Sequence, residues 1–209
     1  VEEAKGFDTT LTVVDGVQLN RGYMSPYFIN NEHTAAVELE DPVILVSNKK
    51  FSSMQELIPL LEKIINSQRP VLIIADDFEN EAMQGLVVNV TRGTLKGCVI
   101  KAPGIGEYRY SFLEDLAVLL GTKTLTQADA DLLKNIVPDD LGSCKKVVVT
   151  RSSTTFVDCS GDTEKISNRI EDLRSQISKP GLSNNEKAVI TSRLSKLSSG
   201  VAVLRVGGA

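Results

Sequence analysis

The chain has 209 residues, of which 42% are hydrophobic and 24% charged, and its net charge at pH 7 is −4. This size and balance are typical of a globular domain with its own core, and they argue against a nucleic-acid partner because Lys and Arg form no basic stripe. The longest apolar runs have about five residues, so we expect no transmembrane helix and no membrane partner.

Short β-rich runs alternate with helical patterns, which predicts an α/β fold. The expected strands are residues 43–47, 71–75, 97–102, 146–150, 154–158 and 201–206. The expected helices between them are residues 53–66, 79–91 and 108–120, the first of which can be capped by Ser52 or Ser53.

The last part of the chain predicts a helical hairpin that lies against the α/β body. Residues 163–177 carry one apolar stripe at helical spacing, made of Ile166, Ile170, Leu173 and Ile177. The turn SKPGLSNN follows, and a second helix is expected to end near Ser198.

Two glycines flank the strand patterns at the ends of the chain. Gly16 ends the strand-like LTVVDG, and Gly200 precedes the strand-like residues 201–206. If these two strands pair, the two ends lie together and the glycines serve either as hinges or as ordinary turns. We expect the chain to be a segment of a longer protein.

Cysteine and histidine content predicts neither a disulfide framework nor a metal centre. Cys98, Cys144 and Cys159 are widely spaced and form no CxxC pair, so we interpret them as reduced thiols. His33 is the only histidine and lies in the polar turn NNEHTA. We therefore expect no metal site and no His-dependent catalytic triad.

One loop keeps an enzymatic hypothesis open. KAPGIGE, residues 101–107, places a GxG between an expected strand and an expected helix, but lacks the third Gly and the Lys-Ser/Thr of phosphate loops. It is either a glycine turn or the phosphate loop of an α/β small-molecule or nucleotide-binding enzyme. Asp76 and Asp77 follow a strand, and we interpret them as caps of the next helix rather than metal ligands.

Two of the expected helices carry more apolar side chains than one packing face requires. In the first, the apolar residues cover an arc of roughly 160°; they are Met54, Leu57, Ile58, Leu60, Leu61, Ile64 and Ile65. In the second, Met83 and Val87 widen the apolar stripe and Val88 lies well off it. With the aromatic turn RGYMSPYFIN, this surplus forms either an exposed apolar groove or a core covered on two sides by a larger sheet.

RGYMSPYFIN resembles the aromatic segment RGYxSPYF of the GroEL-like group I chaperonins. The resemblance continues in register over essentially the whole chain, through AVELEDP, IPLLEK, RPVLIIADDFENEAMQGLVVNVTRGTLK, KAPGIGE and GVAVLRVGG. Asn20, Ile105 and the segment 107–110 depart from the family pattern, which is typical of a divergent, for example organellar, member.

The resemblance implies a chaperonin apical domain-like layered β/α fold with a C-terminal helical hairpin. The apical domain would span residues 16–200, with Gly16 and Gly200 as hinges. Residues 1–15 and 201–209 would be pieces of the intermediate domain.

The resemblance also implies a binding function, because this domain of the family binds non-native polypeptides and the mobile loop of a small co-chaperonin. The matching positions are Tyr23, Tyr27, Phe28, Ile58, Leu61, Ile65, Met83, Val87 and Val88. We expect the three aromatic residues of this set to face outward to a partner. Polar residues beside the groove could orient a bound backbone or form a solvated helix face; they are Glu62, Glu81, Asn89 and Arg92.

The family's ATP site lies in an equatorial domain, outside this chain. We therefore expect no catalytic residue, cofactor or ATPase activity in this fragment, and ATP and Mg for a full-length protein-folding ring. That ring would contain homologous subunits, as a double heptamer, in a bacterial cytoplasm, mitochondrial matrix or plastid stroma. The remaining alternative is a structural role, with the apolar helices buried against a neighbouring subunit.

Overall fold

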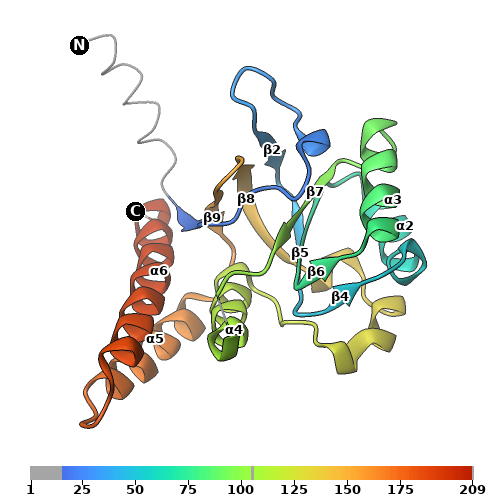
Figure 1. The fold of residues 1–209 in the computed structure, drawn as a ribbon. Coiled ribbons are helices and arrows are strands. Elements are labelled where there is room, and N and C mark those ends of the chain that lie inside the picture. Colours follow the sequence, from blue (N-terminus) through green and yellow to red (C-terminus); the bar gives the residue numbers. More distant parts are fainter. Residues whose placement is uncertain (1–15, 105, 209) are drawn as a thin grey trace.

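The computed structural model describes residues 16–104 and 106–208, which fold around a seven-stranded mixed sheet (Figure 1). The strands follow one another in the order β1 (Val17–Leu19), β9 (Thr154–Cys159), β8 (Gly142–Val149), β3 (Val43–Val46), β5 (Val71–Ala75) and β7 (Gly97–Lys101), and β2 (Val37–Glu40) pairs with β8. Strands β3, β5 and β7 are parallel, and the other pairs are antiparallel. A separate parallel pair joins β4 (Lys50–Phe51) to β6 (Asp77–Phe78).

Helices lie on both sides of this sheet. They are α2 (Ile58–Ser67), α3 (Asn80–Thr91), α4 (Arg109–Leu120), α5 (Thr163–Ile177) and α6 (Asn184–Gly208). Short 3₁₀ segments lie between the helices and strands: η1 (Pro26–Phe28), η2 (Met54–Glu56), η3 (Gly106–Tyr108), η4 (Gln127–Lys134) and η5 (Pro138–Asp140). In Figure 1, α2 and α3 lie to the right of the sheet and the hairpin α5–α6 lies to its left. In the described part of the chain, no helix is long and apolar enough to cross a membrane.

Burial on both faces explains why β3 and β5 form the centre of the sheet. Every residue of VILV in β3 and of VLIIA in β5 is buried. Such continuous apolar runs are typical of parallel strands that helices cover on both faces. The prediction of an α/β fold with these strands is confirmed, as are the strands near residues 97–102, 146–150 and 154–158 and the helix at 163–177.

The predicted strand at residues 201–206 is wrong, because α6 continues to Gly208. Leu197 and Val201, four residues apart, are both buried, which is the spacing of one helical stripe. Gly200 lies inside the helix, where a Cβ atom would come within 2.3 Å of Leu119 Cδ2. Packing against α4 therefore overrides the β propensity of the Val-rich sequence.

The two border glycines nevertheless lie close together. A Cβ atom on Gly200 would lie 3.7 Å from Val17 Cγ2, and one on Gly16 would lie 2.1 Å from the carbonyl oxygen of Phe156. Both glycines thus allow close approaches of packed elements. The expected strand at residues 11–16 lies, apart from Gly16, outside the described residues, and the hinge function stays a prediction.

The hairpin is attached to α4 by a buried ion network. Asp115 on α4 has a side chain that is only 6% exposed. It accepts hydrogen bonds from Arg193 Nε at 2.6 Å and Arg193 Nη2 at 2.9 Å, both from α6, and also from Arg169 of α5. Two guanidinium groups on one carboxylate fix the orientation of both hairpin helices.

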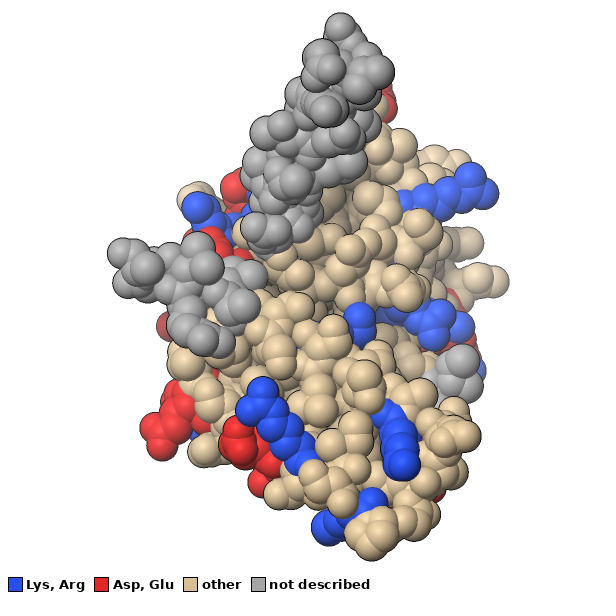
Figure 2. Space-filling model, turned by 90° about the vertical axis from the view of Figure 1, so that its left-hand side faces the viewer, with Lys and Arg blue, Asp and Glu red and all other residues tan. Residues whose placement is uncertain are grey.

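Figure 2 shows the side of the molecule that lies to the left in Figure 1. Its Lys and Arg side chains are separated by uncharged surface and by acidic side chains, so this face carries no continuous basic stripe.

Replacing Asp115 by Ala should lower the free energy of unfolding by about 3 kcal/mol, because two half-buried guanidinium groups lose their shared partner. Urea denaturation followed by circular dichroism measures this loss. The control is Asp172→Ala, an exposed carboxylate on α5, which should change stability by no more than about 0.5 kcal/mol. Equal effects of the two substitutions would contradict the role of the network.

Candidate polypeptide-binding surface

Exposed apolar side chains gather on three neighbouring elements. The large apolar residues that are most exposed in the described chain are Tyr27, Ile58, Ile65, Val88, Tyr110, Leu132 and Val137. The first four lie on η1, α2 and α3, and all four belong to the predicted binding set. We call Tyr27, Ile58, Ile65 and Val88 the α2–α3 face.

The turn SPYF places two adjacent aromatic residues on opposite sides. Pro26 starts the 3₁₀ turn, and Ser25 Oγ accepts a hydrogen bond from the Tyr27 amide at 3.2 Å. As a result, Tyr27 is 72% exposed whereas Phe28 is only 1% exposed and belongs to the core. The expectation that Phe28 faces outward is therefore wrong, because a single step along the turn points its ring inward.

The remaining predicted residues form the layer beneath the α2–α3 face. Leu61 is buried in the core, which corrects its interpretation as surplus surface. Met83 and Val87 are half-buried and pack against the core. Tyr23 is also half-buried, and its hydroxyl donates to the Ala35 carbonyl at 3.3 Å.

Three of the four predicted flanking residues are exposed beside this face: Glu62, Glu81 and Arg92. Asn89 is half-buried, and its Nδ2 donates to the Gly85 carbonyl at 2.7 Å, one turn earlier in α3. Its amide nitrogen is thus engaged within the helix.

Close contact between η2 and α3 holds the start of α2 near α3. A Cβ atom on Gly85 would lie 2.0 Å from Met54 Cγ, so only glycine leaves room for the Met54 side chain. Met54 begins η2, the short segment that leads into α2, and Val88 stands one turn after Gly85 on the same side of α3. The η2 segment that leads into α2 therefore lies against the middle of α3, and η1 packs against α3 as well.

A buried lysine anchors the segment that leads into α2. Lys49, with a side chain that is 3% exposed, forms an ion pair with Glu56. Its ammonium group also lies 4.7 Å from the centroid of the Phe51 ring, which stacks on Phe78 at 5.3 Å. Together, the Lys49–Glu56 ion pair and the Phe51–Phe78 stack hold β4, β6 and η2 against one another at the start of α2.

Glu56 also holds the backbone at the start of η2. Its Oε1 accepts hydrogen bonds from the amides of Ser52 at 2.8 Å and Ser53 at 3.2 Å. Burial alone would raise the pKa of Glu56, but the hydrogen bonds from Lys49 and these amides outweigh it and lower the pKa. This carboxylate is absent from the predicted site residues, although Ser53 followed three residues later by Glu56 is the sequence signature of a capping box.

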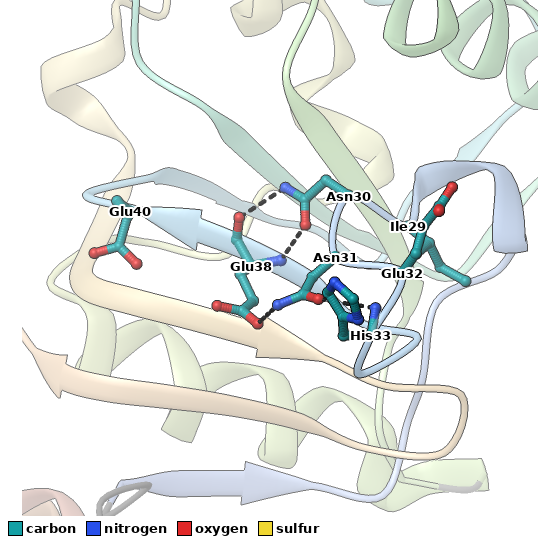
Figure 3. Close-up of a pocket in the computed structure, with 7 residues that line it drawn as sticks. All are labelled: Ile29, Asn30, Asn31, Glu32, His33, Glu38 and Glu40. Carbon is teal, nitrogen blue, oxygen red and sulfur yellow. Dashed lines mark hydrogen bonds between the residues drawn. The ribbon is translucent and has the colours of Figure 1, made fainter.

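Behind η1, an asparagine network fixes the loop that precedes β2 (Figure 3). Asn30 exchanges two hydrogen bonds of 2.8 Å with the backbone of Glu38, and Asn31 Nδ2 donates to Glu38 Oε2 at 2.7 Å. His33 stands on the exposed turn, where its amide donates to Asn31 Oδ1. These hydrogen bonds tie the loop that follows η1 to strand β2.

The KAPGIGE loop connects β7 to α4, as the sequence predicts. At Gly104, φ is +87° and a Cβ atom would lie 2.9 Å from the Phe112 ring, so packing alone accounts for this glycine. Asp76 forms an ion pair with Arg109, the first residue of α4, and Asp77 Oδ1 accepts from the Phe78 amide at 2.9 Å. Neither aspartate caps α3, because the residue at its N-cap position is Glu79.

The three cysteine thiols lie in the core. Cys98, Cys144 and Cys159 are buried, and burial raises the pKa of all three thiols, which disfavours the nucleophilic thiolate. In the described ranges, no three His, Cys, Asp or Glu side chains gather in a metal-binding arrangement. No protein-family model matches this chain.

Phe28→Ala should lower the free energy of unfolding by about 3 kcal/mol, because it opens a cavity in the core. Tyr27→Ala, the matched control one residue earlier, should change it by no more than about 0.5 kcal/mol. Thermal and urea unfolding measure both values, and a reversed order would show that the turn is placed incorrectly.

Glu56→Gln should lower the free energy of unfolding at pH 7 by about 1 kcal/mol, through loss of the cap and the Lys49 pair. A carboxylate with a lowered pKa stabilises the fold above its unfolded-state pKa, near 4.5, and this contribution disappears as pH falls through the folded-state pKa. Urea midpoints from pH 7 to pH 3 should therefore converge for wild type and variant. A constant difference across this range would contradict the assignment.

Proposed function

We propose that this chain is a polypeptide-binding domain of a chaperonin of the GroEL-like group, with the apical-domain fold that this implies. The observation that carries the proposal is the gathering of four strongly exposed apolar side chains on η1, α2 and α3. A soluble domain rarely leaves such side chains together unless they bind a partner. The sequence resemblance independently points to the same residues.

The proposed mechanism relies on apolar burial without sequence readout. Non-native polypeptides expose apolar side chains, and burying roughly 200 Å² of apolar surface contributes about 5 kcal/mol before the costs of association. Met83, half-buried beside the face, supplies a side chain that repacks easily around different partners. Glu62, Glu81 and Arg92 would form the polar rim, and the mobile loop of a small co-chaperonin would bind the same surface.

In a full-length parent, a ring of such domains would raise the effective concentration of binding sites for one unfolded chain. Hydrolysis of ATP with Mg would take place in a domain outside this chain, so the fragment itself would bind polypeptides without catalysis. The localisations that suit this function are the bacterial cytoplasm and the interior of an organelle.

Val88→Glu should weaken binding of an unfolded polypeptide at least about tenfold, because a carboxylate would have to be buried on binding. Fluorescence anisotropy with a labelled, reduced and carboxymethylated protein measures the affinity without ATP. Tyr27→Glu should also weaken binding of the unfolded polypeptide.

Val137→Glu is the matched control, since Val88 and Val137 are both 43% exposed and only Val88 belongs to the α2–α3 face. Circular dichroism verifies that all variants fold. Equal losses of affinity for Val88→Glu and Val137→Glu would show that binding depends on general surface hydrophobicity. A wild-type domain that does not bind the polypeptide would contradict the proposal for the isolated domain.

A further inference from the structure

A large cavity lies between the η4–η5 segment and the sheet, away from the α2–α3 face. Its volume is about 940 Å³, within the range of small-molecule sites. Leu45 of β3, Val118 of α4 and Leu125 form part of its apolar lining, with Ile136 and Leu132 from the opposite wall. Leu132 is 51% exposed, so this wall presents apolar surface that the fold itself does not cover.

The opposite wall is held in position by polar contacts. Lys63 Nζ on α2 donates to the carbonyl oxygens of Lys134 at 2.8 Å and Ile136 at 3.0 Å. Asp129 Oδ2 accepts from the Thr126 amide, and Asp140 Oδ2 accepts from the Val137 amide at 3.1 Å. These contacts fix both 3₁₀ segments, so the cavity is a preformed feature of the fold.

The charge of the lining is unbalanced. Four carboxylates line the cavity, from Asp129, Asp139, Asp140 and Asp162, against the two ammonium groups of Lys123 and Lys165. Thr124 also lines it, and its buried Oγ1 finds no hydrogen-bond partner in the described chain. A buried hydroxyl without a protein partner is uncommon and is satisfied by a bound water or by a ligand.

We propose that this cavity binds a small amphipathic cation, with an apolar chain or ring against Leu45, Val118 and Leu125 and a protonated amine beside the carboxylates of η5. The net negative lining favours a cation over an anion of the same shape. This site is independent of the proposed polypeptide binding, which uses the opposite side of α2.

Matched eight-carbon probes test the proposal: octylamine, octanol and octanoate, titrated at pH 7 into the ¹⁵N-labelled chain. Octylamine should shift the amide resonances of Leu45, Val118 and Leu125 saturably. Its dissociation constant should be at least about tenfold lower than that of octanoate, with octanol between them.

Two substitutions separate the contributions of charge and shape. Asp139→Asn should raise the octylamine dissociation constant about threefold, whereas Asp172→Asn, an exposed carboxylate of α5 away from the cavity, should leave it unchanged. Val118→Trp should fill the cavity and abolish binding of all three probes. Equal affinities for octylamine and octanoate, or no saturable shift at these resonances, would overturn the proposal.

Discussion

Both faces of the parallel strands β3, β5 and β7 must be kept from water, and this constraint determines where the helices lie. Each residue of β3 and β5 is buried, so neither face can be left to solvent. Helix α4 contacts β3 and β8, while α2 contributes Leu60, Leu61 and Ile64 to the core. Once these inner stripes are used, the apolar residues that remain on α2 and α3 point outward.

Buried charges then orient the helices on this apolar frame. Lys49 and Glu56 hold the start of α2, and Asp115 joins α4 to both hairpin helices through Arg169 and Arg193. Burying such groups costs solvation free energy, which their mutual hydrogen bonds offset only in one arrangement. Apolar packing would allow helices to slide, whereas a bidentate arginine–carboxylate contact allows one register.

The two apolar surfaces outside the core suit different partners. The α2–α3 face consists of side chains that project from convex elements, and it offers few fixed polar contacts, which suits polypeptides of many sequences. The cavity beside η4 and η5 is concave and carries charged groups and a buried hydroxyl, which suits one small ligand. Helix α2 links the two, since Lys63 binds the backbone of the η4–η5 wall while Ile58 and Ile65 belong to the face.

By itself, the sequence determined the elements with the clearest local patterns. These are the continuous apolar runs of β3, β5 and β7 and the helical periodicity of α3, α4 and the hairpin stripe of α5. It also identified the surplus apolar residues Ile58, Ile65 and Val88, since the arc of a helix wheel depends only on order along the chain. Tertiary structure decided which aromatic residue of the SPYF turn faces water. Tyr27 and Phe28 are adjacent aromatic residues, and only the position of the core relative to the turn determines that Phe28 is buried and Tyr27 exposed. It also made residues 201–206 helical, because packing of Gly200 on Leu119 outweighs the weak local preference of a Val-rich segment for strand.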